Sequence, residues 1–94
     1  MAIAESKVVI KNKMGLHARP STQIATTASR FQADFRIVKD GQEVDAKSVL
    51  ELLMLAAECG SELVITAEGD DAAEAAAAIA KLVETRFGEL DVDV

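Results

Sequence analysis

The sequence predicts an α+β fold in which a four-stranded, mostly antiparallel sheet is covered on one face by three helices. Short segments of alternating apolar and polar residues are typical of strands that bury one face. Longer segments with apolar residues at helical spacing lie between them, and the pair Asp40-Gly41 is a hairpin signal. The elements follow in the order β-α-β-β-α-β-α. Strands with one apolar and one polar face need helices to cover the apolar face.

The first part of the chain supplies a strand, a loop and a helix. The strand is expected over residues 5–11, where Val8 and Ile10 share one face. Residues 12–16 are expected to form a loop. A helix is then expected from residue 18 or 19 to about residue 30, because apolar residues follow there at helical spacing.

A hairpin is expected in the middle of the chain. Residues 34–39 alternate as a strand with Phe35 and Ile37 on one face. The Asp-Gly pair that follows favours a tight two-residue turn. Residues 42–45 form the short return strand.

The last part of the chain is expected to hold two helices and one strand. Residues 48–57 are strongly apolar and predict a helix that ends before Gly60. Residues 62–68 alternate as a strand, and residues 72–87 predict a final helix that Gly88 terminates.

Composition limits the class of protein. The 94 residues fit one domain over 1–94, with residues 89–94 expected as a flexible tail. A net charge of −6 argues against nucleic acid as a partner. No apolar run is long enough for membrane insertion, and no signal-peptide pattern is present, so we expect a cytoplasmic protein. Cys59 is the single cysteine and is interpreted as a small apolar residue at a helix end.

The only histidine and the only proline of the chain, His17 and Pro20, stand at the predicted start of the first helix. Proline is tolerated at a helix start, where unpaired N–H groups attract anions. Arg19 stands between the two and adds a cation. A histidine in this setting is suited to carrying a phosphoryl group, since imidazole offers a neutral, nucleophilic ring nitrogen near pH 7. The alternative is an ordinary surface histidine before a helix.

Ser48 and Glu51 have the spacing of a capping box at the start of the middle helix. In such a box the serine oxygen accepts the Glu51 N–H, and the glutamate reaches back to the serine N–H. Asp71 and Glu74 predict a similar cap for the last helix.

The middle helix has more apolar residues than one face can bury. Its two apolar stripes are formed by Leu52, Leu55 and Ala56, and by Val49, Leu50 and Leu53. We expect the second stripe to be exposed near Ser48 and to bind a partner, because exposed apolar patches mark interaction sites. The alternative is a helix buried on both sides.

Two motifs resemble those of the histidine-containing phosphocarrier (HPr) family of the bacterial phosphotransferase system. Gly15-Leu16-His17-Ala18-Arg19-Pro20 resembles the family's histidine signature, and Ala46-Lys47-Ser48-Val49-Leu50 resembles the signature around a regulatory serine. The resemblance covers essentially residues 3–87 and implies the HPr-like open-faced sandwich. Asn12-Lys13-Met14-Gly15 and the middle helix are similar to the nitrogen-branch (NPr-like) members. Met14 departs from many sugar-branch members, which have a small polar residue there.

The resemblance implies a phosphocarrier of a phosphoenolpyruvate-dependent system that serves sugar transport or nitrogen regulation. His17 would accept a phosphoryl group from enzyme I and pass it to an enzyme IIA domain. The backbone N–H groups of Ala18 and Arg19 and the Arg19 guanidinium are suited to binding phosphoryl oxygens. Pro20 would preset the first helical turn.

The resemblance also implies regulation and partner docking around the same site. Ser48 would be the target of an HPr serine kinase/phosphorylase in bacteria that have one. The docking residues would be Thr22, Gln23, Val49, Leu50 and Leu53. We expect a monomer that is not a stand-alone enzyme and needs no metal or organic cofactor.

The sequence leaves two other functions open. One is a regulatory binding module that acts through phosphorylated Ser48 and the apolar docking surface. The other is a small-molecule-binding domain, for which the sequence offers no glycine-rich cradle.

Overall fold

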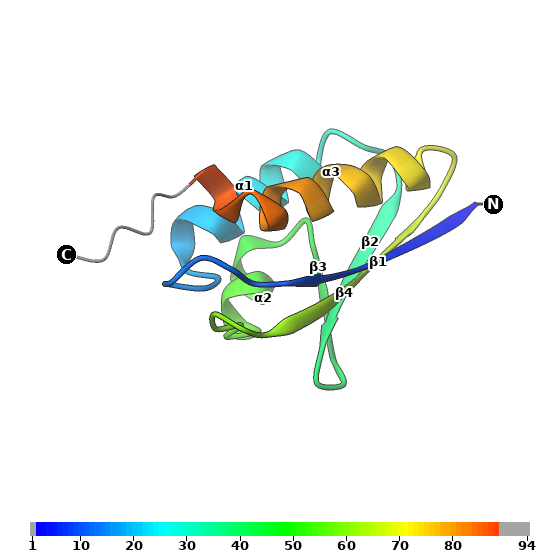
Figure 1. Cartoon of the computed structure of the whole chain (residues 1–94). Helices are drawn as coiled ribbons and strands as arrows, with labels where there is room; N and C mark the ends of the chain where they lie inside the picture. The colour runs from blue at the N-terminus through cyan, green and yellow to red at the C-terminus, as the bar shows by residue number, and fades with distance from the viewer. Residues whose placement is uncertain (1, 89–94) are drawn as a thin grey trace.

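The structure is a computed structural model that describes residues 2–88. Its elements follow the predicted order (Figure 1). They are β1 (Ile3–Val9), α1 (Ala18–Ala28), β2 (Asp34–Lys39), β3 (Gln42–Asp45), α2 (Val49–Met54), β4 (Glu62–Glu68), α3 (Ala72–Glu84) and a final 3-10 turn, η1 (Arg86–Gly88). The predicted tail over residues 89–94 lies outside the described residues.

The strands form one sheet in the order β1-β4-β2-β3, and each neighbouring pair is antiparallel. Inward-facing side chains pair across the sheet, as in Val8 opposite Leu63 and Ile37 opposite Ile65. The β2–β3 hairpin turns through Asp40-Gly41, whose φ values are +50° and +81°. Positive φ at both turn residues is the geometry that Asp-Gly favours, so the hairpin prediction is confirmed.

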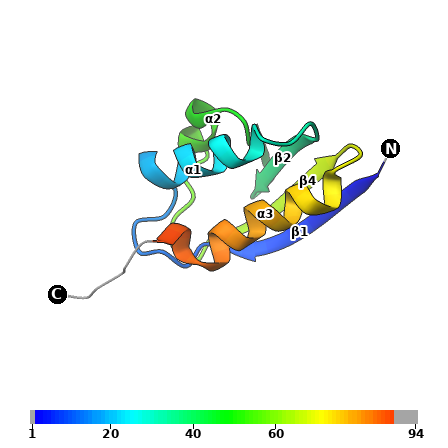
Figure 2. The same ribbon diagram turned by 90° about the horizontal axis from the view of Figure 1, so that it is seen from above.

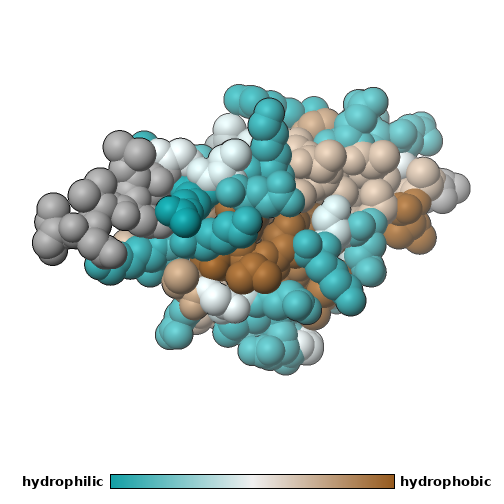
Figure 3. All heavy atoms as spheres, in the orientation of Figure 1, coloured by the Kyte–Doolittle hydropathy of each residue, from teal (hydrophilic) through white to brown (hydrophobic). Residues whose placement is uncertain are grey.

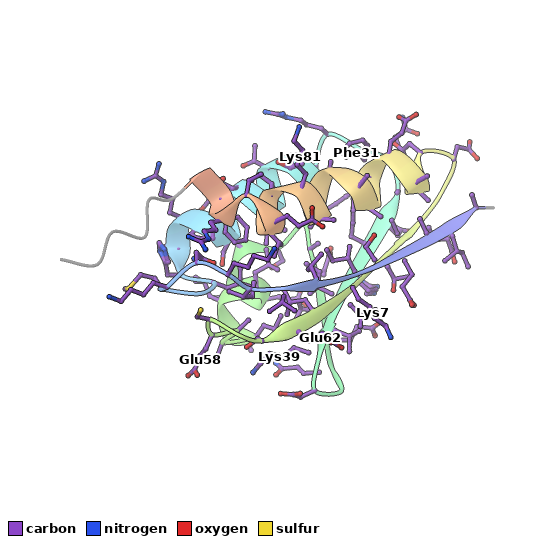
Figure 4. All side chains as sticks on the ribbon, viewed as in Figure 1. Lys7, Phe31, Lys39, Glu58, Glu62 and Lys81 are labelled. Atoms are coloured by element: carbon purple, nitrogen blue, oxygen red, sulfur yellow. The ribbon has the colours of Figure 1, made fainter. Side chains whose placement is uncertain are left out.

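The helices cover one face of this sheet. In the view from above, α1 and α3 lie side by side, and α2 lies beyond α1 (Figure 2). The opposite face carries polar side chains, among them Lys7 and Glu62, which point away from the helices (Figure 4). The aliphatic core between sheet and helices includes Phe35, Ile10, Ile24, Ile37, Leu52, Leu55, Leu63, Ile65, Ile79 and Val83.

The alanine-rich helix α3 packs closely on β1 and β4. It buries Ala72, Ala75 and Ala76 against the sheet, where a small side chain allows close approach. Ala73 and Ala77 face outward, so the surface over α3 is only weakly hydrophobic (Figure 3). This helix therefore contributes packing, and its outer face carries no large apolar group.

The middle helix is shorter than predicted. It ends at Met54, three residues before the predicted end at Ala57, because Ala56 has φ +51° and turns the chain away. The Ala57 carbonyl then accepts the N–H of Leu16 at 2.8 Å, a contact that a continued helix could not make. Cys59 consequently lies in an exposed loop, so its predicted place at a helix end is wrong.

The start of α3 also differs from the prediction. The Asp71 carboxylate does not cap this helix; it accepts the backbone N–H groups of Gln32 at 2.9 Å and Ala33 at 3.0 Å. Asp71 thereby ties the α1–β2 connection to the β4–α3 turn. The helix ends at Glu84, earlier than predicted, and the buried Phe87 follows with φ +56°.

Candidate functional site

The loop between β1 and α1 is pressed against the segment that follows α2. Gly15 has φ +67°, and a Cβ there would run into the Ala57 carbonyl oxygen. Leu16 donates its N–H to that same oxygen at 2.8 Å. Figure 4 shows Glu58, the next residue, at the end of the molecule where this loop lies. Only glycine suits position 15, because the backbone there is left-handed and lies too close to the Ala57 carbonyl to leave room for a Cβ.

Asn12 holds this loop from inside. Its side chain is fully buried, and its Nδ2 donates to the Gly15 carbonyl at 2.8 Å. The Gly15 N–H donates in turn to the Asn12 carbonyl at 3.1 Å. Asn12 was expected to lie in the loop, and no role was predicted for it. The available signal was its residue type, since asparagine often bonds to the backbone of a turn.

His17 occupies the N-cap position of α1, as predicted. Its backbone is extended, with φ −93° and ψ −168°, and its half-buried imidazole does not cap the helix. The first intrahelical hydrogen bond runs from the Ser21 N–H to the His17 carbonyl at 3.0 Å. The N–H groups of Ala18 and Arg19 precede that bond, and they are two of the donors that a helix start leaves unpaired.

The first turn of α1 therefore places three kinds of phosphate-binding group in consecutive residues. These are the imidazole of His17, the backbone N–H groups of Ala18 and Arg19, and the guanidinium of the exposed Arg19. Pro20 follows, is buried, and has no N–H to offer. An anion bound here gains from the N–H donors and from the helix dipole.

An apolar surface lies on α2, next to this loop. It consists of Leu50, Leu53 and Met54, whose exposed fractions are 69%, 38% and 64%. The exposure of Leu50 and Leu53 confirms that the helix is not buried on both sides. Val49 was expected in the same patch, but it is half-buried and packs against the core. Met54 was missed, although its spacing of four residues from Leu50 places it on the same helical face.

Met14 is a further exposed apolar residue, with 71% of its surface accessible. It directly precedes Gly15 in the loop. Because α2 leads within three residues to Ala57, which binds this loop, the apolar surface and the His17 loop belong to one end of the molecule.

Ser48 caps α2, although only one arm of the predicted box forms. Its Oγ accepts the Glu51 N–H at 3.2 Å. The Glu51 carboxylate accepts the N–H of Asp45 at 3.2 Å and not that of Ser48. The Ser48 N–H donates instead to the Asp45 carbonyl at 3.1 Å. The predicted hydrogen bond from the Ser48 N–H to the Glu51 carboxylate was wrong, because the tight turn before the helix supplies the Asp45 carbonyl as the acceptor.

The two predicted docking residues of α1 differ in their contacts. Thr22 is exposed, and its hydroxyl donates to the Ala18 carbonyl at 2.8 Å. Gln23 is half-buried, and its Nε2 donates to the Phe87 carbonyl at 3.1 Å. Gln23 thus links α1 to the end of the described chain.

A hollow of about 590 Å³ lies where β4 turns into α3. This turn is at the opposite end of the sheet from the start of α1 (Figure 1). The lining of the hollow is mostly acidic and includes Asp34, Glu68, Asp70 and Glu74. Within residues 2–88, no group of three or more His, Cys, Asp or Glu side chains could hold a metal ion. None of the helices in this range is long and apolar enough to cross a membrane.

Comparison with known proteins decides the family. Residues 4–85 match the family described as the PTS HPr component phosphorylation site. The chain belongs to the HPr family. HPr from Treponema pallidum is 42% identical over 82 residues, which cover 87% of this chain and 93% of the relative. Members of the HPr family are phosphocarrier proteins of the phosphotransferase system, so this membership supports a phosphocarrier role.

A nitrogen-branch relative and a solved structure agree with this assignment. The phosphocarrier NPr of Shewanella violacea is 43% identical over 89 residues, which cover 95% of this chain and 98% of the relative. The crystal structure of HPr from Thermoanaerobacter tengcongensis is 41% identical, with a TM-score of 0.89. That comparison covers 93% of this chain and 98% of the other. The HPr-like open-faced sandwich and the likeness to NPr, both predicted from the motifs, are supported.

Proposed function

We propose that His17 accepts a phosphoryl group from phosphorylated enzyme I and passes it to an enzyme IIA domain. The observation that carries this proposal is the start of α1, where the only imidazole of the chain does not cap the helix and adjoins the N–H groups of Ala18 and Arg19. In each transfer, a ring nitrogen attacks phosphorus as the bond from phosphorus to the donor breaks. Membership in a family of phosphocarriers supports the same role.

Arg19 would stabilise the charge on the phosphoryl group while it is transferred. The guanidinium is exposed and stands two residues after His17, so it can reach an incoming group without leaving the helix. Planar, charge-assisted hydrogen bonds suit phosphoryl oxygens. The backbone N–H groups would hold the same oxygens in the phosphorylated state.

Enzyme I and IIA domains would dock on the apolar surface of α2, with Thr22 and Gln23 at its rim. Leu50 and Leu53 are exposed there and would be desolvated by a partner. Leu53→Glu should therefore weaken enzyme I binding about tenfold or more, measured by calorimetry. Ala73→Glu adds the same charge to the exposed face of α3 and should leave binding unchanged. Equal affinity of both variants would show that α2 is not the docking surface.

Phosphorylation of Ser48 would regulate this docking. A phosphate at the start of α2 is favourable for the helix itself but places charge beside the apolar surface. Ser48→Asp should keep the circular dichroism spectrum and slow His17 phosphorylation, because a partner must then desolvate the charge. Ser48→Asp with the wild-type affinity for enzyme I would contradict this regulation.

The second candidate function is a regulatory binding module in which transfer at His17 is secondary. The position of Ser48 beside the exposed Leu50 favours it. Loss of physiological activity in His17→Ala, but not in Ser48→Ala, would identify the phosphocarrier function. The reverse result would identify the binding module.

Labelling with phosphoenolpyruvate tests the leading proposal. Enzyme I and labelled phosphoenolpyruvate should place one acid-labile, base-stable phosphate on His17, and an IIA domain should remove it. The protein should act as a monomer in this assay. Label that persists in His17→Ala would overturn the assignment.

A further inference from the structure

We propose that Asn12 is a positioning residue for phosphoryl transfer at His17. This inference rests on the proposed function and concerns the same site. Within residues 2–88, only Asn12 and Ser21 have polar side chains that are fully buried, and both flank His17 in the sequence. Burying an amide side chain costs free energy unless the amide forms hydrogen bonds. The burial of Asn12 beneath this loop therefore needs a physical explanation.

The bonds around Gly15 supply that reason. Its carbonyl accepts two donors, the Nδ2 of Asn12 at 2.8 Å and the N–H of His17 at 3.1 Å. The same peptide unit ends in the N–H of Leu16, which donates to the Ala57 carbonyl at 2.8 Å. One peptide plane is therefore fixed at both ends, by Asn12 on its carbonyl side and by Ala57 on its amide side.

This fixed plane joins Gly15 to Leu16, one residue before His17, and the His17 N–H is bonded to its carbonyl. Its orientation sets where the His17 backbone begins, and hence where the imidazole stands relative to the N–H groups of Ala18 and Arg19. Gly15 cannot hold the plane alone, since glycine has the widest backbone freedom of all residues. The amide of Asn12 removes that freedom without touching the phosphoryl group. Holding reacting groups in place lowers the barrier, and a displacement of about 1 Å can cost up to a hundredfold in rate.

Asn12→Ala tests this role. It should slow His17 phosphorylation about tenfold by lowering kcat, with KM for this protein as the substrate of enzyme I unchanged. Ser21→Ala is the matched control: it also removes a buried polar group near His17, but the Ser21 hydroxyl makes no hydrogen bond within residues 2–88. Ser21→Ala should keep the wild-type kcat. Asp71→Ala controls for lost stability, since Asp71 accepts two N–H groups remote from the loop.

A small-molecule phosphoryl donor distinguishes an effect on the position of His17 from an effect on the docking of enzyme I. Phosphoramidate can phosphorylate imidazole directly: its P–N bond breaks, a bond from phosphorus to the His17 ring nitrogen forms, and ammonia leaves. Asn12→Ala should slow this reaction by the same factor as the enzyme I reaction. Wild-type rates with both donors in folded Asn12→Ala would overturn the proposal. Failure of enzyme I to label the wild-type protein, with phosphoramidate still active, would instead reject the proposed function.

A measurement on the wild-type protein needs no folded variant. The side-chain amide protons of Asn12 should exchange with solvent at least a hundredfold more slowly than those of the exposed Gln42, before and after phosphorylation. Exchange of Asn12 at the rate of Gln42 would overturn the proposal whatever the variants show.

Discussion

Helices α1 and α2 pack against each other, yet they begin in different ways. At α2, the Ser48 hydroxyl accepts the N–H of Glu51 at 3.2 Å, so a side chain of the protein fills the helix start. At α1, His17 has the extended backbone of a capping residue, but its imidazole does not cap. The N–H groups of Ala18 and Arg19 precede the first intrahelical bond.

The difference separates a terminus built for stability from one suited to a ligand. A serine cap contributes about 1 kcal/mol to the stability of a helix. At the start of α1 the His17 side chain makes no such contribution, and backbone N–H groups at a helix start are suited to binding an anion.

His17→Asp should convert the start of α1 into a capped one. We expect complete loss of the label from enzyme I and phosphoenolpyruvate, because the ring nitrogen is gone. We also expect a gain of about 0.5–1 kcal/mol in the free energy of unfolding, because a carboxylate caps and complements the helix dipole. Thermal and urea unfolding measure the gain. His17→Ala is the control, and a His17→Asp protein less stable than His17→Ala would contradict the contrast.

Gly15→Ala should disrupt the loop that presents His17. The variant combines a left-handed φ of +67° with a clash against the Ala57 carbonyl oxygen. We expect a loss of about 2–4 kcal/mol in unfolding free energy, together with slower transfer. Gly41→Ala is the matched control, because its φ is +81° but nothing lies within 4 Å of the added Cβ. Gly41→Ala should lower the unfolding free energy by only about 1 kcal/mol. Equal losses at both sites would show that the clash with the Ala57 carbonyl contributes nothing.

Arg19→Ala should affect transfer more than folding. The guanidinium is exposed, and its removal should slow phosphoryl transfer about tenfold, which corresponds to about 1.4 kcal/mol of barrier. The melting temperature should change little. Arg30→Ala, at the other end of the α1 segment and also exposed, should transfer at the wild-type rate. Normal transfer in Arg19→Ala would exclude Arg19 from the site.

Ser48→Ala should remove the cap of α2 and lower the unfolding free energy by about 1 kcal/mol. Ser48→Thr retains a hydroxyl and should recover most of that loss. Chemical unfolding of the three proteins decides the matter. If alanine and threonine gave the same stability, the Ser48–Glu51 hydrogen bond would contribute nothing.

Three strands and the hairpin were predictable because their signals are local, whereas β1 spans Ile3–Val9 and not the expected residues 5–11. The strands over Asp34–Lys39, Gln42–Asp45 and Glu62–Glu68 begin and end where the sequence places them. Each has a two-residue period that leaves one apolar face, and Asp-Gly specifies the turn between the first two. The start of α1 was equally predictable, since proline fixes the first turn and leaves His17 at its N-cap.

Two of the predictions that failed depend on partners remote in the chain. The end of α2 is set by Ala57, whose carbonyl bonds to Leu16 in a loop some forty residues earlier. Asp71 looks like a cap in the sequence, but the folded chain brings the N–H groups of Gln32 and Ala33 to its carboxylate. Local patterns assign a polar side chain to its nearest backbone donors, and tertiary contacts can supply better ones.

The fold class, the family resemblance and the position of His17 at a helix start could all be predicted from the amino-acid sequence. These follow from hydrophobic period, turn chemistry and two contiguous motifs, all of which act over a few residues. The folded structure was needed to show that Asn12 is buried beneath Gly15 and that Val49 packs against the core while Leu50 and Leu53 are exposed. Burial depends on which surfaces meet when sheet and helices pack, and no local pattern contains that information.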